Sequence, residues 1–208
     1  MGPRLEFWLE FASTYSYLAA MRIETLAQAL GVAVDYRPFL LGPIFASQGW
    51  NTSPFNIYEA KGRYMWRDME RLCERYDLPL RRPSVFPRNG LLAARIAVLG
   101  SEQPWEPAFT RAVYRANFGE DREISEASVL SEILSDLGQD AHGLVEQAGS
   151  PEIKAQLREQ TEAAARAGIF GAPSFIAGDE LFWGNDRLEQ ALDWAVESFV
   201  KSSGIITI

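Results

Sequence analysis

LEFWLEFASTYS, residues 5–16, joins an apolar run to a short turn rich in Ser and Thr. Large apolar side chains occupy both faces of the run, which predicts a buried strand over residues 4–11. Apolar groups then recur at helical spacing over residues 15–30 and stop at Gly31, a residue type that commonly ends helices. Ser13 is therefore expected between the carboxyl end of a strand and the amino end of a helix. Such a position gathers free backbone N–H groups and favours an anion.

Further strands are predicted near both ends of the chain. A strand over residues 32–38 follows the first helix and completes a βαβ unit, whose crossover is expected to be right-handed. A third strand is predicted over residues 173–177 and a fourth over 180–183, with a hairpin turn at Gly178-Asp179. A last helix follows at about 187–202. The βαβ and ββα halves can join into one mixed four-stranded sheet flanked by helices.

The middle of the chain is predicted to be mostly helical. Residues 39–57 are rich in Gly, Pro, Ser and Asn but also carry aromatics, so we predict a long, partly ordered loop with a functional role. A helix is predicted over 58–76 and a proline-rich loop over 79–89. Further helices are predicted over residues 90–100, 104–118, 125–137, 140–147 and 151–167.

This split order of elements, with Ala172-Pro173 opening the third strand, is the layout of the thioredoxin-like fold. In that fold a cis proline faces the start of the first helix, and the residue before it exposes backbone groups that can pair with a peptide-like ligand. We therefore predict an α/β fold with a thioredoxin-like βαβ…ββα sheet. Residues 1–38 and 168–203 would form the thioredoxin-like domain, and residues 39–167 a large all-helical insertion domain.

Composition excludes several classes of protein. The chain has 208 residues and 47% hydrophobic residues, which is typical of a globular protein with a substantial core. The formal net charge of −8 argues against nucleic acid or an anionic membrane as a partner. No apolar run approaches the roughly 18 residues of a membrane span, and no secretory signal precedes the first strand. We expect a cytoplasmic protein. The apolar tail, residues 204–208, is either a packed terminus or a loose end.

The residue inventory also limits the chemistry. Cys73 is the single cysteine and lies mid-helix at an apolar position, so we expect it in the core and exclude dithiol–disulfide exchange by a Cys-x-x-Cys pair. His142 is the only histidine, and its place on a helix of the middle region argues against a Ser-His-Asp triad. No metal-ligand spacing occurs. An anion held at Ser13 is therefore expected to come from a ligand.

Three segments together point to one family. They are FASTYSYLA at 11–19, GAPSF at 171–175 and WGNDRL at 183–188, and shorter matches occur at 41–44 (LGPI) and 61–65 (KGRYM). With these segments the sequence resembles the 2-hydroxychromene-2-carboxylate isomerase family. That family is related to kappa-class glutathione transferases within the DsbA-like thioredoxin superfamily. The resemblance extends over essentially the whole chain.

The resemblance implies glutathione as cofactor, with Ser13 as the catalytic residue facing the glutathione sulfur. A hydroxyl can donate one hydrogen bond to a thiolate, and the adjacent helix end stabilises negative charge. Both effects favour the ionised form and so lower the pKa of the thiol. The alternative is that Ser13 only caps the helix, and the two roles can coexist.

The resemblance implies further contacts with glutathione. Ala172 matches the position whose backbone pairs with the cysteinyl unit, and Pro173 holds that geometry. Residues 183–186 match the segment that holds the γ-glutamyl end, with an ordinary helix cap after a glycine turn as the alternative. Lys61 either pairs with a carboxylate of glutathione or substrate, or lies on a solvated helix face. The implied cofactor-binding residues are Ser13, Lys61, Ala172, Pro173, Trp183, Gly184, Asn185 and Asp186.

The chain departs from the family on the substrate side. The expected substrate-binding residues are Phe45, Phe55, Asn56, Phe86 and Arg88. Related sequences carry a lysine near Phe45 that the family uses on the substrate carboxylate, but no lysine precedes Lys61 here. Phe55 and Phe86 are apolar where characterised isomerases have polar residues. The sequence therefore indicates glutathione more firmly than an aromatic hydroxy acid.

Three functions are compatible with this pattern. In the first, an isomerase, the glutathione thiolate adds to an activated double bond of a 2-hydroxychromene-2-carboxylate-like compound, the resulting single bond rotates, and elimination returns glutathione. This would be cis–trans isomerisation in the breakdown of aromatic compounds. The second is a kappa-class-like glutathione transferase or peroxidase, acting on a small aromatic or unsaturated substrate. The third is a non-catalytic thioredoxin-like binding module. The family commonly forms dimers, so we expect a homodimer.

Overall fold

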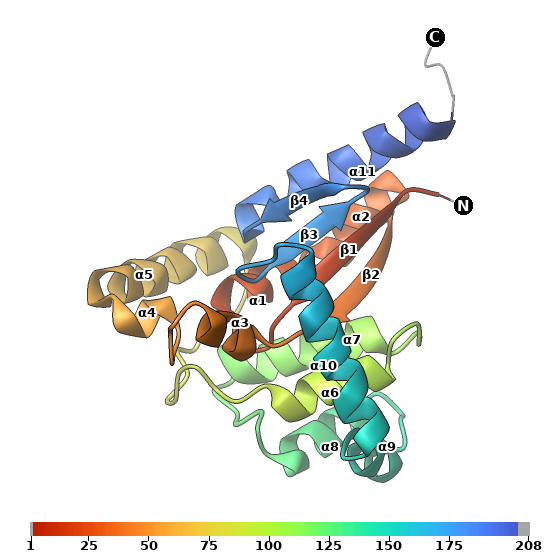
Figure 1. The fold of residues 1–208 in the computed structure, drawn as a ribbon. Coiled ribbons are helices and arrows are strands. Elements are labelled where there is room, and N and C mark those ends of the chain that lie inside the picture. Colours follow the sequence, from red (N-terminus) through yellow and green to blue (C-terminus); the bar gives the residue numbers. More distant parts are fainter. Residues whose placement is uncertain (1, 204–208) are drawn as a thin grey trace.

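One mixed four-stranded sheet forms the centre of the fold in the computed structural model, which describes residues 2–203 (Figure 1). The strands are β1 (Arg4–Leu9), β2 (Ala33–Pro38), β3 (Ser174–Ala177) and β4 (Glu180–Trp183), in the order β2-β1-β3-β4. β1 pairs with β2 in parallel and with β3 antiparallel, and β3 pairs antiparallel with β4. This confirms the predicted sheet. The tail 204–208 lies outside the described residues.

Helices cover both faces of the sheet. On one face lie α1 (Thr14–Ala20), α2 (Ile23–Leu30) and α11 (Leu188–Ser203), and α11 packs on β1 and β3. The apolar side chains of β1 alternate between the faces, as expected for a strand buried on both sides. Phe7 stacks on Phe175, whereas Trp8 contacts Phe39 in a separate cluster with Ile44 and Ala164 on the opposite face.

A long helical region separates β2 from β3 and lies to the left of the sheet and below it in Figure 1. Its helices are α3 (Leu41–Ser47), α4 (Pro54–Ile57), α5 (Glu59–Tyr76), α6 (Leu91–Leu99), α7 (Glu106–Tyr114), α8 (Ala127–Asp136), α9 (Ala141–Ala148) and α10 (Pro151–Arg166). A π-helical turn, η1 (Arg115–Gly119), follows α7, and a 3₁₀ turn, η2 (Asn185–Arg187), precedes α11. One hydrophobic core joins this region to the sheet. The division into two domains stays a prediction.

The predicted helix over 15–30 is two helices, because the chain breaks at Met21 and Arg22. The guanidinium of Arg22 lies 4.0 Å from the centre of the Tyr76 ring and donates to Asn185 at 3.1 Å. It also pairs with Glu189 of α11. These contacts with distant segments set the direction of the chain at Arg22. The spacing of apolar residues within one helix cannot predict them.

The predicted loop over 39–57 contains α3 and α4, so that prediction was wrong in part. These two helices were not predicted because they contain Gly42, Pro43 and Pro54, residue types that usually indicate a loop. Prolines in a first helical turn are compatible with a helix because the N–H groups there have no intrahelical partner. Ser53 caps α4 by accepting the Phe55 N–H at 3.3 Å.

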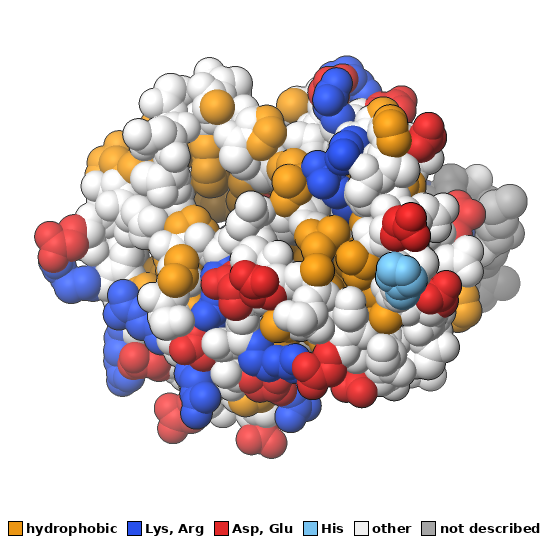
Figure 2. Space-filling view, turned by 90° about the horizontal axis from the view of Figure 1, so that it is seen from below, with side chains coloured by type: hydrophobic (Ala, Val, Ile, Leu, Met, Phe, Trp, Pro, Cys, Tyr) orange, Lys and Arg blue, Asp and Glu red, His pale blue; other side chains and the backbone are white. Residues whose placement is uncertain are grey.

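The face of the molecule in Figure 2 carries side chains of both charges. Seen from below, acidic and basic side chains are interspersed over the face in Figure 2. Arg122 pairs with Glu132 at 2.6 Å, and Arg115 pairs with Glu120 at 3.2 Å. Over residues 2–203, no helix combines the length and the apolarity that crossing a membrane requires.

Candidate functional site

The turn between β1 and α1 places Ser13 opposite a segment far along the chain. Ser13 is the N-cap of α1, and its hydroxyl accepts the Ser16 N–H at 3.2 Å. The same hydroxyl donates to the carbonyl of Ala172 at 2.8 Å. Ser13 therefore caps the helix and also faces the start of β3.

The segment before β3 is held in place by its own backbone contacts. The Ala172–Pro173 peptide bond is cis. The Pro173 carbonyl accepts the Gly184 N–H at 3.0 Å, and the Ser174 hydroxyl donates to the Gly171 carbonyl at 2.9 Å. The structure thus brings Ser13, Ala172 and Pro173 together and sets Gly184 next to them.

The predicted residues 183–186 fall into two environments. Trp183 is exposed on one side, and its ring lies 4.8 Å from that of Phe170. Gly184 has a φ of 109°, a conformation that favours glycine. Asn185 is buried and accepts a hydrogen bond from Arg22. The Asp186 side chain is 75% exposed, and a carboxylate so exposed can meet a ligand's ammonium group.

Three of the five predicted substrate-binding residues lie together beside α1. The Phe55 ring is 6.3 Å from that of Tyr15, two residues after Ser13. The Asn56 amide donates to the Phe86 carbonyl at 3.4 Å. The Phe86 ring lies 5.0 Å from Trp66 in an edge-to-face contact. These contacts form an aromatic wall.

The remaining predicted residues of the helical region occupy other settings. Phe45 on α3 packs against Trp50, with ring centres 5.7 Å apart. Lys61 is exposed on α5, and its Nζ lies 4.8 Å from the Tyr58 ring. Lys61 thus has a solvated position next to the exposed face of α4.

Arg88 has a buried guanidinium, and its side chain is only 2% exposed. It pairs with Asp121, lies 3.2 Å from Glu123, and donates to both oxygens of Asn117 at 3.1 and 3.2 Å. A backbone hydrogen bond from Ser84 and the Arg88 guanidinium hold the pKa of Asp121 below its usual range. These protein groups already use the donors of the Arg88 guanidinium, and a contact between Arg88 and the substrate stays a prediction.

The sequence analysis missed the residues that hold the Ser13 turn. Glu10 lies three residues before Ser13, and its carboxylate accepts the Ala12 N–H at 3.0 Å. Burial raises the pKa of Glu10 to about 7. An acidic residue at the end of an apolar strand was a visible signal for Glu10. Tyr114 and Asn117, which donate to the carbonyls of this turn, gave no signal because they lie about 100 residues away.

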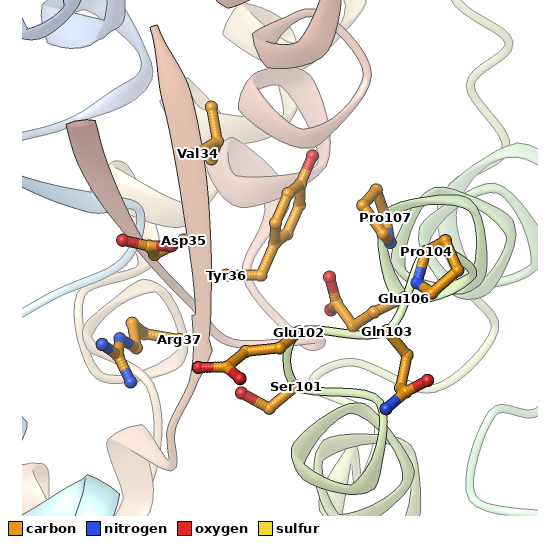
Figure 3. A pocket seen from close by; sticks show the side chains of 10 residues that line it. All are labelled: Val34, Asp35, Tyr36, Arg37, Ser101, Glu102, Gln103, Pro104, Glu106 and Pro107. Atoms are coloured by element: carbon orange, nitrogen blue, oxygen red, sulfur yellow. The ribbon is translucent and has the colours of Figure 1, made fainter. Parts of the chain in front are cut away.

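A second buried carboxyl lies outside this site. A cavity of about 290 Å³ lies between β2 and residues 101–107, and none of the predicted site residues lines it. The side chains that line this cavity are drawn in Figure 3. Glu106 is buried there and accepts the Thr110 hydroxyl at 2.7 Å. Burial raises the pKa of Glu106 to about 8.

Cysteine and metal chemistry find no support in the described part of the chain. Cys73 is buried in the core, as predicted, and burial raises the pKa of its thiol to about 11. The thiol is therefore protonated near neutral pH and is a poor nucleophile. No three His, Cys, Asp or Glu side chains within residues 2–203 cluster in a way that could hold a metal ion.

Residues 4–194 match the family model of the DSBA-like thioredoxin domain. This chain belongs to that family. Among its relatives is the 2-hydroxychromene-2-carboxylate isomerase of Sphingobium xenophagum, 32% identical over 91% of this chain and 96% of that protein. The isomerase of Pseudomonas putida is 31% identical over 88% and 90%. Human glutathione S-transferase kappa 1 is 28% identical over 91% and 90%.

A solved structure supports the same placement of this DSBA-like protein. The structure of a 2-hydroxychromene-2-carboxylate isomerase superposes with a TM-score of 0.87 at 25% identity, covering 98% of this chain and all of that one. The family predicted from the three sequence segments is confirmed. The relatives named here are isomerases and a glutathione transferase.

Proposed function

We propose that this DSBA-like protein is a glutathione-dependent isomerase acting on a 2-hydroxychromene-2-carboxylate-like compound. One observation carries the proposal: at the amino end of α1, the Ser13 hydroxyl lies 2.8 Å from the Ala172 carbonyl oxygen. A peptide-like thiol that pairs with the backbone of Ala172 would bring its sulfur to this hydroxyl. The two isomerase relatives at 31% and 32% identity support the choice of reaction.

Binding of glutathione would exchange one hydrogen bond for two. The Ser13 hydroxyl has a single proton, which it now donates to Ala172. When glutathione binds, the Ser13 hydroxyl would donate its hydrogen bond to the glutathione sulfur. The Ala172 carbonyl would then accept a hydrogen bond from the cysteinyl N–H of glutathione. Because a hydrogen bond to a charged acceptor is stronger than one to a neutral acceptor, the exchange favours the thiolate over the thiol.

Other residues would hold the two ends of glutathione. The exposed carboxylate of Asp186 suits the γ-glutamyl ammonium group, and Trp183 forms an apolar wall beside it. Asn185, tied to Arg22, orients this segment rather than binding directly. Lys61 is the candidate for the glycyl carboxylate, since it is exposed and forms no ion pair within residues 2–203.

The reaction uses the sulfur as a temporary nucleophile. Bound glutathione would supply a thiolate nucleophile that can add reversibly to a double bond conjugated to a carbonyl group, which would allow rotation about that bond without consuming glutathione. Phe55, Asn56 and Phe86 would line the space for the ring, with Phe45 further out.

A cation for the substrate carboxylate comes from a residue not predicted from the sequence. The Arg82 guanidinium lies 4.9 Å from the centre of the Trp66 ring, which contacts Phe86. Arg82 is exposed and has no carboxylate partner within residues 2–203. We assign it the role that the family gives to the missing lysine near Phe45.

The test is to follow the absorbance of 2-hydroxychromene-2-carboxylate with the protein, with and without glutathione. We expect isomerisation only with glutathione, whose concentration stays constant. If glutathione causes no change in absorbance at any pH, 2-hydroxychromene-2-carboxylate is not a substrate and this part of the proposal is wrong. A cytoplasmic location and a homodimer stay predictions, and gel filtration with light scattering tests the second.

A kappa-class-like transferase or peroxidase is the second candidate, favoured by the 28% identity to human glutathione S-transferase kappa 1. A transferase consumes glutathione as a conjugate, and a peroxidase oxidises it to the disulfide. Quantifying glutathione, its disulfide and any conjugate after turnover separates the three reactions. A non-catalytic binding module predicts no affinity for glutathione by calorimetry.

A further inference from the structure

We propose that Tyr114 and Asn117 are positioning residues, which clamp the backbone of the turn that carries Ser13. We call this pair the carbonyl clamp. The inference rests on the proposed function, in which Ser13 meets a thiolate. It adds residues that neither touch the cofactor nor belong to the segments shared with the family.

The turn itself is held by its carbonyl groups. The Glu10 carbonyl accepts two hydrogen bonds, from the Ser13 N–H at 2.9 Å and from the Tyr114 hydroxyl at 2.8 Å. The next carbonyl, that of Phe11, accepts the Asn117 amide at 3.0 Å. Two successive peptide groups before Ser13 are thus fixed from outside the turn.

Both clamp residues are buried and come from one helical stretch. Tyr114 ends α7, and Asn117 lies in the π-helical turn η1. Their exposed fractions are 0% and 1%. Because buried polar groups are costly without partners, both hydrogen bonds are strongly favoured. Short π-helical turns are rare in proteins, but those that occur are often found at functional sites. This agrees with a role of η1 in placing Asn117.

The orientation of the Asn117 amide is set by a charge. Its Oδ1 accepts a hydrogen bond from Arg88 at 3.1 Å, which leaves its NH₂ group for the Phe11 carbonyl. A flipped amide would direct its N–H groups at the guanidinium, which is only a donor. Asp121 and Glu123 hold Arg88 in turn. This network runs from the partly exposed carboxylates of Asp121 and Glu123, through the buried Arg88, to the turn before Ser13.

The clamp matters because the Ser13 hydroxyl acts through one hydrogen bond. A group that stabilises charge must be held within about half an ångström to be effective. Movement of the Glu10 and Phe11 peptides would move Ser13 relative to Ala172, and the stabilisation of the thiolate would fall. Glutathione itself would still bind, since its peptide part contacts Ala172 and residues 183–186.

The test compares Tyr114→Phe and Asn117→Leu with Tyr17→Phe as matched control. Tyr17 is also buried, and its hydroxyl donates to the Pro79 carbonyl at 2.6 Å rather than to a carbonyl of the turn. Its ring lies 6.4 Å from that of Tyr114, and the change to phenylalanine keeps this ring contact. None of the three changes adds charge. Each tyrosine change removes one hydrogen bond of a buried side chain, whereas Asn117→Leu removes two, one to the Phe11 carbonyl and one from Arg88. The pKa of the thiol of bound glutathione is measured from the thiolate absorbance over a pH titration, and calorimetry gives the affinity.

We expect the pKa of the bound thiol to rise by about one unit in both clamp variants, a tenfold loss of thiolate at low pH. Tyr17→Phe should lower the melting temperature and leave the thiol unchanged. Hydrogen exchange of the Ala12 and Ser13 amides in the ligand-free protein should quicken about tenfold in the clamp variants. This second readout does not depend on glutathione.

Folded clamp variants with unchanged thiol pKa and unchanged amide exchange overturn the clamp, and so does an equal shift in Tyr17→Phe. Faster exchange with unchanged thiol pKa also overturns it, since the turn is then held without consequence for the sulfur. A wild-type protein that does not bind glutathione, or that leaves its thiol pKa unchanged, refutes the proposed function and the clamp's role in it. The wild-type measurement therefore separates the two failures.

Discussion

The two sides of the candidate site are held by different interactions. On the sheet side, Ser13, Ala172 and Gly184 are fixed by hydrogen bonds to main-chain carbonyls of 2.8 to 3.0 Å. On the helical side, Phe55 and Phe86 are placed by ring contacts of 6.3 and 5.0 Å with Tyr15 and Trp66. The sheet side is expected to hold the cofactor and the helical side the substrate.

This difference bears on how each side tolerates change. Hydrogen bonds to the main chain require particular distances and directions, so few residues satisfy them. Aromatic packing is broader in geometry, and volume-conserving exchanges cost little. A fold can therefore keep its thiol site while the residues over it change.

Arg88→Ala should have the largest effect, and it acts on stability. Removing a buried guanidinium leaves Asn117 without its partner and weakens the support of Asp121 and Glu123. We expect a loss of about 3 kcal/mol in the free energy of unfolding, measured with urea. The exposed Arg82→Ala is the control, expected within about 0.5 kcal/mol of wild type. A stable Arg88→Ala protein with only a raised KM would instead place Arg88 on the substrate.

Ser13→Ala tests the sheet side directly. Losing the hydroxyl should lower the glutathione-dependent kcat/KM by about 100-fold, the cost typical of removing one donor from a developing or bound anion. It should also cost about 1 kcal/mol of stability, because Ser13 caps α1. Ser150→Ala is the matched control, since Ser150 caps α10 by accepting the Ile153 N–H. An equal loss of activity in both variants would show that Ser13 acts only as a helix cap.

Two carboxyls, that of Glu10 at the Ser13 turn and that of Glu106 outside the site, predict a pH dependence of stability. The pKa values of Glu10 and Glu106 are raised from 4.5 to about 7 and about 8. Both therefore hold a proton more tightly in the folded protein, so their stabilisation is complete below about pH 4.5 and lost as the pH rises through 7 and 8.

Glu10→Gln and Glu106→Gln should each flatten this decline, by at most roughly 1.4 kcal/mol per pH unit. Urea unfolding at several pH values between about 5 and 9 measures it. The Glu10 change should act up to about pH 7, and the Glu106 change up to about pH 8. Slopes identical to that of the wild type would show that these carboxyls are not buried as described.

Arg82→Ala should have the smallest effect and tests the helical side. We expect about a tenfold rise in KM for the carboxylate substrate with kcat nearly unchanged, because one exposed charge contact is lost. Its neighbour Arg81 is the control, since the Arg81 guanidinium donates to the Glu120 carbonyl at 3.5 Å instead. An equal KM effect from Arg81→Ala, or none from Arg82→Ala, would remove Arg82 from the site.

Local patterns predicted most of the fold. The strands and the long helices were found because side-chain periodicity reflects neighbours within a few residues. Gly31 has a φ of 66° and ends α2, as a glycine in that position is expected to do. The break at Arg22 and the helices α3 and α4 were missed. The break follows from contacts with α5 and α11, and prolines in first turns hid the two short helices.

The sheet, the family and the place of Ser13 between a strand and a helix could be predicted from the sequence alone. The contact of Ser13 with Ala172, 159 positions away, and that of Tyr114 with the Glu10 carbonyl, 104 positions back, could be seen only in the folded chain. The tertiary structure also placed Arg88 in a buried network with Asp121, Glu123 and Asn117. The physical reason is one of range: propensity and periodicity act between near neighbours, whereas hydrogen bonds between distant segments depend on how the whole chain packs.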